Sequence, residues 1–381
     1  MNATAVQVRP EQAGTGRKRP AARSDRVTVL IVVETVAAGQ RLMEVVRLFE
    51  GDARVRVVFT APPKADAGRA VRRFLSSVGA KTVPWQYALE HPFELAVATD
   101  CRTVDGLSCP IVLAPHVTPP VAMSRASVVA LAHIEQRGWL AHQMPDEDQK
   151  TEIVGDPEFD RLLVSLAYRD AYRWALRVLP RQRLVVVAST LAAAPLLGCA
   201  PELPAQLIAE LPRDDYRIAL LADPDILQLP GRSQVLSRLR GAIRDGLRVV
   251  SEESDWCAVL AAADVVVGDC GPASLYATAV GIPIVLAAEP PEEVLCDGSP
   301  MADLAALAPR ISAREPVARQ MACLTPGSPF IDYSRVAARI TSAPGAFAKN
   351  MCELIYRRLD ISRPAYEPVA HPAPPPTLAC H

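Results

Sequence analysis

The chain has 381 residues, half of them hydrophobic, and a formal net charge of −1 at pH 7. This length favours two domains with substantial cores, and the near-neutral charge gives no overall attraction to nucleic acids or membrane surfaces. The nine cysteines include no C-x-x-C pair, which favours reduced, mostly buried thiols over a disulfide framework or a zinc site.

The two ends of the chain are predicted to be disordered. Residues 1–26 form a basic arm, and no apolar segment of a secretory signal follows it. Residues 362–381 are rich in proline, which lacks the N–H that helices and sheets need. No apolar run between these tails reaches the roughly 20 residues of a membrane-spanning helix. We therefore expect a cytoplasmic protein.

Between the tails, short hydrophobic runs alternate with longer amphipathic segments. In the first half, strands are expected over residues 27–33, 54–60, 94–99, 110–114 and 127–132, and helices over 38–50, 65–78 and 135–143. In the second half, strands are expected over 183–188, 216–222, 247–251, 264–267 and 283–287, and helices over 202–211, 232–245, 254–262 and 272–280. This alternation is typical of an α/β protein.

The predicted strands are hydrophobic throughout, which is expected when helices cover both faces of a parallel sheet. Each half should therefore be a doubly wound, Rossmann-type domain. A long helix over 157–178 marks the boundary, which gives domains 27–180 and 181–361, with a closing helix over 346–359 in the second. Two such domains facing each other would leave a central cleft at the carboxyl ends of both sheets, where ligands usually bind.

The segment of residues 254–289 carries the strongest functional pattern. A buried strand runs into Gly-Asp-Cys-Gly at 268–271, and a proline follows as the first helical residue. A glycine turn that feeds a helix N-terminus leaves N–H groups free, which suits a diphosphate. Asp269, Gly271 and Ser274 are therefore candidate site residues, with Asp269 also a candidate for catalysis. Asp269 could instead cap the helix, and Ser274 could bond within its first turn.

Other polar residues follow predicted strands, where their side chains would face the cleft. His116 follows the fourth strand, and its imidazole suits proton transfer near neutral pH. Ser189 and Thr190 could hold a phosphate, while Asp223 and Glu289 could contact ribose hydroxyls. Each of these residues could instead be an ordinary turn or loop residue.

Two further residues, Gly155 and Asp160, lie near the domain boundary in the sequence Gly-Asp-Pro-Glu-Phe-Asp-Arg. They could stand at the mouth of the cleft, although the intervening Asp156 could simply cap the helix that begins at Pro157. Nothing in the pattern calls for a cofactor or a metal. The turn over residues 34–39 has one glycine instead of G-x-G-x-x-G, and there is no Walker sequence.

Four segments together resemble a known family. They are V-G-D-P-x-x-D-R at 154–161, the strand that ends in Ser-Thr at 189–190, A-D-V-V-V-G-D-C-G-P-A-S-L-Y at 263–276, and G-I-P-I-V-L at 281–286. In this order they resemble the CDP-glycerol glycerophosphotransferase-like proteins, relatives of the UDP-N-acetylglucosamine 2-epimerases and of GT-B glycosyltransferases. The resemblance covers about residues 27–340.

This resemblance implies a GT-B-like fold whose second domain binds a nucleotide-activated donor and whose first domain binds the acceptor. His116 matches the family's histidine, a candidate general base. Asp269 with Ser274 matches the donor turn, and Gly155 with Asp160 matches the G-x-P-x-x-D segment.

The first hypothesis is a transferase that moves a glycosyl or polyol-phosphate group from a nucleotide-diphosphate donor to a hydroxyl acceptor. His116 would act as base, and the turn at 268–274 would bind diphosphate. Several polar groups common in the family are absent here, so a non-catalytic nucleotide-sugar-binding or partner protein is the alternative. A UDP-sugar 2-epimerase is a weaker one. A homodimer is left open.

Overall fold

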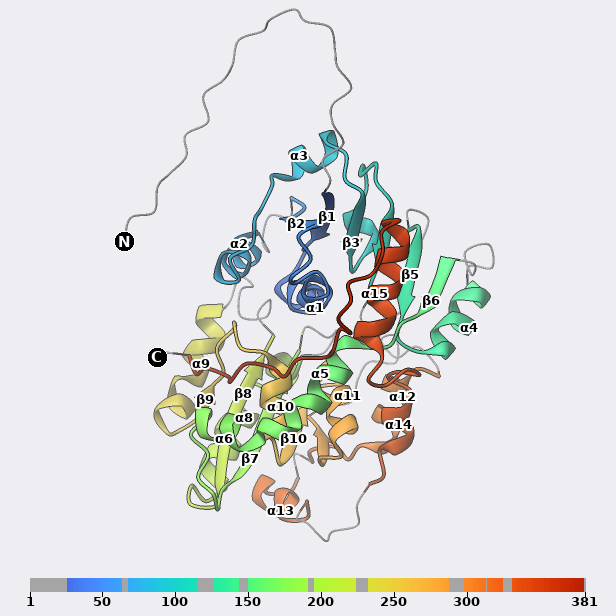
Figure 1. Cartoon of the computed structure of the whole chain (residues 1–381). Coiled ribbons are helices and arrows are strands. Elements are labelled where there is room, and N and C mark those ends of the chain that lie inside the picture. The colour runs from blue at the N-terminus through green and yellow to red at the C-terminus, as the bar shows by residue number, and fades with distance from the viewer. Residues whose placement is uncertain are drawn as a thin grey trace, which may run out of the picture.

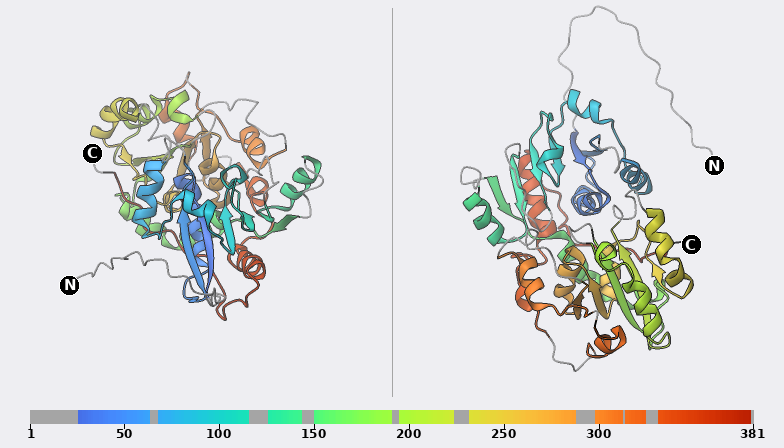
Figure 2. Two further views of the ribbon diagram at one scale, coloured as in Figure 1. Left: turned by 90° about the horizontal axis from the view of Figure 1, so that it is seen from above. Right: turned by 180° about the vertical axis from the view of Figure 1, so that it is seen from behind.

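The computed structural model describes residues 26–63, 68–115, 126–143, 150–190, 195–223, 232–287, 298–312, 314–324 and 331–379. Two parallel sheets form separate halves of the molecule, with helices α1 (Val36–Arg47) and α5 (Pro157–Ser165) lying between them (Figures 1 and 2). The predicted α/β class with two doubly wound, Rossmann-type sheets is confirmed.

The first sheet has six strands in the order β2-β1-β3-β4-β5-β6, and every pair is parallel. Its strands are β1 Val27–Val32, β2 Val55–Thr60, β3 Leu95–Ala98, β4 Ile111–Leu113, β5 Val128–Leu131 and β6 Thr151–Ile153. Its helices are α1 Val36–Arg47, α2 Gly68–Ser77, α3 Trp85–Glu90 and α4 Ile134–Gln143, with a 3₁₀ turn at Cys101–Thr103. The short strand β6 and helix α3 were not predicted.

The second sheet has five parallel strands in the order β11-β10-β7-β8-β9. Its strands are β7 Arg183–Ser189, β8 Tyr216–Ala222, β9 Arg248–Val249, β10 Val265–Gly268 and β11 Ile284–Leu286. Its helices are α7 Leu196–Cys199, α8 Leu203–Glu210, α9 Arg232–Arg244, α10 Trp256–Ala262, α11 Pro272–Ala277, α12 Pro300–Leu307, α13 Val317–Ala322 and α14 Ser334–Ala338. The strand order reverses between β7 and β10, which is where doubly wound sheets bind ligands.

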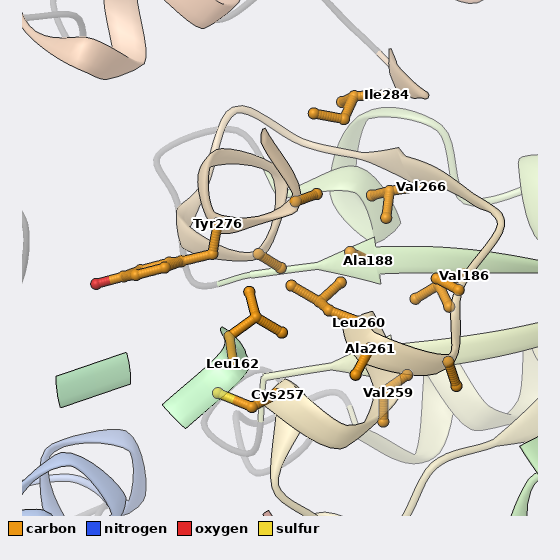
Figure 3. Packing of buried hydrophobic residues seen from close by; sticks show 14 of the residues in the cluster. Leu162, Val186, Ala188, Cys257, Val259, Leu260, Ala261, Val266, Tyr276 and Ile284 are labelled. Carbon is orange, nitrogen blue, oxygen red and sulfur yellow. The ribbon is translucent and has the colours of Figure 1, made fainter. Parts of the chain in front are cut away.

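The central strands of each sheet are buried on both faces, as the hydrophobic runs predicted. Along β7, Val186 packs into a cluster with α10 and α11, while Val185 and Val187 pack into a second cluster with α8 and α9. Figure 3 shows the first of these clusters, from which the Tyr276 hydroxyl points away. Adjacent residues of one strand therefore belong to different cores, which explains the absence of a polar-apolar alternation.

The connection between the halves is a broken helix. One helix was expected over 157–178, but α5 Pro157–Ser165 and α6 Arg169–Ala175 are separated by a 3₁₀ turn at Leu166–Tyr168. The Ser165 hydroxyl donates to the Arg161 carbonyl at 2.7 Å, a side-chain bond to the preceding turn that commonly bends helices.

The end of the chain requires two corrections. Helix α15, Phe347–Arg358, was assigned to the second domain, but its buried residues Met351 and Ile355 pack with β1 and α1 of the first half. An amphipathic pattern shows that one face is buried and does not show against which sheet. The proline-rich segment was expected to be disordered, but residues 362–379 are described and Ala373 is buried. Within the described residues, no helix combines the length and apolarity needed to span a membrane.

Candidate functional site

A pocket of about 140 Å³ lies at the carboxyl ends of the second sheet, beside the reversal of strand order. Thr190 after β7 and Asp223 after β8 line it, together with Ala273 at the start of α11. Ala37 and Gln40 of α1 form the wall contributed by the first half. The pocket is therefore shared by both halves, at the place where the sequence predicted a cleft.

A larger cavity of about 430 Å³ lies between α1, α5, α15 and the C-terminal segment. Its described lining includes Asp160 and none of the residues predicted at strand ends. We take the smaller pocket as the candidate site because parallel sheets bind ligands at the carboxyl ends of their strands.

Asp269 does not reach the pocket, because its carboxylate is used inside the fold. Its side chain is 3% exposed. The oxygens accept the Thr190 hydroxyl at 2.6 Å, the Thr190 N–H at 2.7 Å and the Leu196 N–H at 3.0 Å. Burial raises the pKa of Asp269, and these donors oppose the rise. The residue predicted to be catalytic thus positions Thr190, which does line the pocket.

The glycine turn at 268–271 is closely packed. The buried Ser274 hydroxyl donates to the Asp269 carbonyl at 2.6 Å. A Cβ at Gly271 would lie 1.8 Å from the Thr190 Oγ1 atom, and one at Gly268 would lie 2.3 Å from the Ser274 Oγ atom. Both glycines are therefore required by close approach of side chains. Ser274 and Gly271 thus stabilise the turn without lining the pocket.

The first turn of α11 is the part of this segment that faces the pocket, through Pro272 and Ala273. Gly271 is its N-cap and gives it no side-chain cap. Amide groups at such a terminus are available to an anion. Because Pro272 has no N–H, the groups of this turn that an anion could meet are the backbone N–H groups of Gly271 and Ala273, whereas the Asp269 and Ser274 side chains hold the turn in place.

The charged groups that line the pocket are acidic. They are Glu158 of α5, Asp223 after β8 and Glu252 after β9. No lysine or arginine is found among its described lining residues. A diphosphate here would be bound by amides and hydroxyls, while the carboxylates would suit sugar or ribose hydroxyls. In the described part of the chain, no three His, Cys, Asp or Glu side chains gather as a metal site would require.

A buried ionic cluster joins the two halves behind the pocket. Arg41 of α1 contacts Glu158 at 2.5 Å and Asp156 at 3.2 Å, and the Tyr276 hydroxyl of α11 donates to the same carboxylates at 3.1 and 2.9 Å. Burial would lower the pKa of Arg41, but the two carboxylates raise it above the ordinary value. Burial raises the pKa of Asp156 despite Arg41, and it raises that of Tyr276 strongly.

A second set of ion pairs between the two halves lies beside this cluster. Arg161 of α5 pairs with Glu44 of α1, and its Nε atom lies 2.7 Å from the Asp255 carboxylate at the N-cap of α10. The sequence reasoning missed Arg41, Tyr276 and these partners. One signal in the sequence could have indicated a buried ion pair. Arg41 follows Ala38 by three residues, which places its charge on the apolar face of α1.

Gly155 and Asp160 lie away from the pocket, at the point where the chain enters α15. Asp160 accepts the N–H groups of Gly345 at 2.6 Å and Phe347 at 3.0 Å. Gly155 has φ +98°, and a Cβ there would lie 2.8 Å from the Ala343 carbonyl oxygen. In this structure both residues shape the return of the chain to the first half.

The remaining predicted residues divide into three groups. Ser189 is buried and accepts the Leu197 N–H at 3.1 Å, so its hydroxyl holds the start of α7. Thr190 and Asp223 line the pocket as expected. His116 and Glu289 lie outside the described residues, so their roles stay predictions.

Comparison of this structure with solved structures identifies its architecture as GT-B-like. A variant of the wall teichoic acid polymerase TagF shares 14% identity over 88% of this chain and 90% of its own, with a TM-score of 0.63. The UDP-GlcNAc 2-epimerase from Neisseria meningitidis, solved bound to UDP-GlcNAc, shares 11% identity over 87% and 99%, with a TM-score of 0.53.

The UDP-GlcNAc 2-epimerase from Methanocaldococcus jannaschii has a TM-score of 0.50 at 10% identity, over 82% of this chain and 97% of its own. No protein-family model and no curated protein sequence matches the chain. The resemblance seen in the motifs is thus confirmed for the fold. At sequence identities this low, structural similarity establishes the fold alone.

Proposed function

We propose that this protein binds a nucleoside-diphosphate-linked sugar or polyol in the pocket between the two sheets and transfers the glycosyl or polyol-phosphate group to a hydroxyl acceptor. The observation that carries the proposal is the position of the pocket. It lies at the carboxyl ends of the second sheet beside the strand-order reversal, with the first turn of α11 on one wall and α1 of the other half opposite.

The chemistry of the lining fits the two parts of such a donor. The backbone N–H groups of Gly271 and Ala273 would meet the diphosphate, while Asp223 and Glu252 would accept from hydroxyl groups. A protein of the same fold, the UDP-GlcNAc 2-epimerase from Neisseria meningitidis, was solved bound to UDP-GlcNAc, which supports this class of ligand.

In a glycosyl transfer, the acceptor oxygen attacks the anomeric carbon, the bond from that carbon to the diphosphate breaks, and a nucleoside diphosphate leaves. In a polyol-phosphate transfer, the oxygen attacks the distal phosphorus and a nucleoside monophosphate leaves. The acceptor proton passes to a general base, for which His116 remains the candidate. Amide dipoles fixed near the diphosphate would stabilise the charge of the leaving group.

Binding is tested by titrating UDP, CDP, GDP and dTDP and following both the melting temperature and the tryptophan fluorescence, to which Trp256 in the pocket lining contributes. We expect one or more nucleotides to stabilise the protein. Ala37→Leu should weaken this binding by at least about tenfold because the larger side chain enters the pocket from α1. Ala167→Leu, on the exposed turn between α5 and α6, is the matched control. The absence of binding by all four nucleotides contradicts the proposal.

The second candidate is a nucleotide-sugar-binding protein without catalysis. One observation favours it. The Asp269 and Ser274 side chains, which were predicted to contact the ligand, instead form hydrogen bonds to Thr190 and to the Asp269 carbonyl inside the fold. Donor hydrolysis or transfer that is lost in His116→Ala, with nucleotide binding retained, supports the enzyme. Binding without turnover, unaffected by His116→Ala, supports the binding protein.

A further inference from the structure

The last described residues of the chain, 362–379, cross both halves of the molecule. We call this segment the strap. It leaves α15, passes α5 and α10, and ends beside the edge of the second sheet (Figure 1). It is a further crossing of the domain boundary, after the α5–α6 connection and the return of α15 to the first half.

The strap is fixed to the first half near its beginning. The Arg54 guanidinium donates to the side-chain oxygen and to the carbonyl of Ser362, both at 2.9 Å. The Tyr366 hydroxyl lies 2.7 Å from the Glu50 carbonyl oxygen and 3.2 Å from that of Leu48. These contacts join the strap to the end of α1 and the loop that follows it.

Its middle is fixed to the broken helix between the halves. Ala373 is buried, and its N–H donates to the Ser165 hydroxyl at 2.9 Å. Its carbonyl accepts the Tyr172 hydroxyl at 2.6 Å. Ser165 therefore serves two purposes: it bends the α5–α6 connection, and it accepts the strap where that bend occurs.

Its end extends the second sheet beyond the edge strand β9. Leu378 pairs with Val250 in an antiparallel bridge. The Ser251 N–H donates to the Thr377 carbonyl and the Ala379 N–H donates to the Val249 carbonyl, both at 2.9 Å. This is strand addition by the chain's own C-terminal residues.

The same end of the strap also holds the rim of the pocket. The Ser254 Oγ atom accepts the Thr377 N–H at 2.9 Å and lies 3.1 Å from the Thr377 carbonyl. Ser251 and Ser254 both line the pocket, and Trp256 follows them at the start of α10. The strap thus contacts the pocket wall directly, while its other end is attached to the first half.

We propose that the strap is a positioning segment: it fixes the Ser251–Ser254 rim and holds the two halves in the arrangement that forms the pocket. Separating the halves would break contacts at one end or the other. The prolines of the strap restrict the unfolded segment and so lower the entropy lost when it docks. The consequence for ligand binding rests on the proposed function, but the mechanical role does not.

The test compares a chain that ends at Arg363 with a control that ends at Ala379, which retains the whole strap. Hydrogen exchange is followed at the Ser251 amide, the donor to Thr377. We expect its exchange to be at least about tenfold faster in the short chain, with a larger radius of gyration in solution. Adding a synthetic peptide of residues 364–379 should restore protection. Unchanged exchange at Ser251 and an unchanged radius overturn the proposal.

If the short chain does not fold, two full-length variants carry the test. Tyr366→Phe removes the hydroxyl at one end of the strap, and Ala379→Pro removes the N–H that bonds to Val249 at the other. Ala379→Pro should speed exchange around residues 249–254, whereas Val369→Ala, at a position 63% exposed, should not. Equal exchange in Ala379→Pro and Val369→Ala counts against the strap.

Titration of UDP and CDP separates this inference from the proposed function. If the full chain binds a nucleotide and the short chain binds it at least about tenfold more weakly, the positioning role is supported. If both bind equally, the positioning role is wrong and the proposed function stands. If the full chain binds neither nucleotide, the proposed function loses support, and the exchange experiment still decides whether the strap holds the halves.

Discussion

The carboxylate of Asp269 accepts both the hydroxyl and the backbone N–H of Thr190, at 2.6 and 2.7 Å. Asp269 follows β10 and Thr190 follows β7, the two strands between which the sheet order reverses. A buried acid therefore holds the residue that lines the pocket at this reversal.

This relationship predicts different results for two substitutions of Asp269. Asp269→Ala leaves the Thr190 and Leu196 donors without their acceptor, so we expect the free energy of unfolding to fall by about 2–4 kcal/mol. Asp269→Asn keeps the shape and one acceptor oxygen, and its loss should be about 1 kcal/mol or less. Urea unfolding of both variants measures this. Equal, small losses would show that the carboxylate does not hold the turn.

The pH dependence of the same pair follows from the pKa of Asp269, which burial raises. The folded state then binds this proton more tightly than the unfolded state. Its contribution to stability therefore decreases as pH rises from about 3.9, the usual unfolded value, through the raised folded pKa. Asp269→Asn lacks this titration. Unfolding at several pH values should show the variant gaining stability relative to the wild type as pH rises through that window; a relative loss would contradict it.

Gly271→Ala should destabilise the second half by about 1–3 kcal/mol, because the added Cβ meets the Thr190 Oγ1 atom at 1.8 Å and the Asp269 Oδ1 atom at 2.8 Å. The control is Gly241→Ala on α9, where nothing lies within 4 Å of the new methyl group. That change should stabilise the helix by about 0.5–1 kcal/mol. Thermal unfolding of both variants makes the comparison, and equal melting temperatures would argue against close packing of the turn.

Arg41→Met tests the buried ionic cluster. It leaves the Asp156 and Glu158 carboxylates without their cation, and we expect a loss of about 3–5 kcal/mol in the free energy of unfolding. The same change at Arg102, whose side chain is 80% exposed in its pair with Asp100, should cost at most about 1 kcal/mol.

A rescue experiment separates charge from packing in this cluster. Combining Arg41→Met with Asp156→Asn and Glu158→Gln removes the uncompensated charges while keeping similar volumes. Most of the lost stability should return. If the triple variant is no more stable than Arg41→Met, the loss comes from packing of the Arg41 side chain and not from its charge.

Cys270 should alkylate slowly at neutral pH. Burial, helped by the neighbouring Asp269 carboxylate, raises the pKa of this thiol to about 11. Since the thiolate is the reactive form, the rate should increase about tenfold per pH unit up to that value. Iodoacetamide labelling read by mass spectrometry measures the rate, with the exposed Cys199 as the rapidly labelled reference. Labelling of Cys270 as fast as Cys199 at pH 7.5 would contradict a half-buried thiol that is protonated at that pH.

Sequence patterns predicted the elements that depend on local composition. Continuous hydrophobic runs such as the one in β7 are expected where helices cover both faces of a sheet, so the doubly wound sheets followed from them. The glycines near 268–271 correctly marked a sharp turn at a strand end. Thr190 and Asp223 were predicted as site residues by the same reasoning, because the carboxyl ends of parallel strands share one edge.

The sequence could not show which groups each polar side chain bonds. Asp269 was expected to face the ligand, but it faces Thr190; Asp160 was expected near the cleft, but it accepts amides at the start of α15, 185 and 187 residues further along the chain. Long-range partners of this kind depend on how the halves dock. A carboxylate at a strand end satisfies the local pattern equally well with either set of partners.

The sequence by itself determined the two sheets, their helical layers and the edge at which a ligand would bind, because hydrophobic periodicity and turn chemistry act over a few residues. Only the tertiary structure decided that Arg41 and Tyr276 meet Asp156 and Glu158, that α15 returns to the first half, and that the proline-rich end docks as a strap. These contacts join residues far apart in the chain, and the physical reason is that their stability comes from burial and pairing that exist only once both halves have folded.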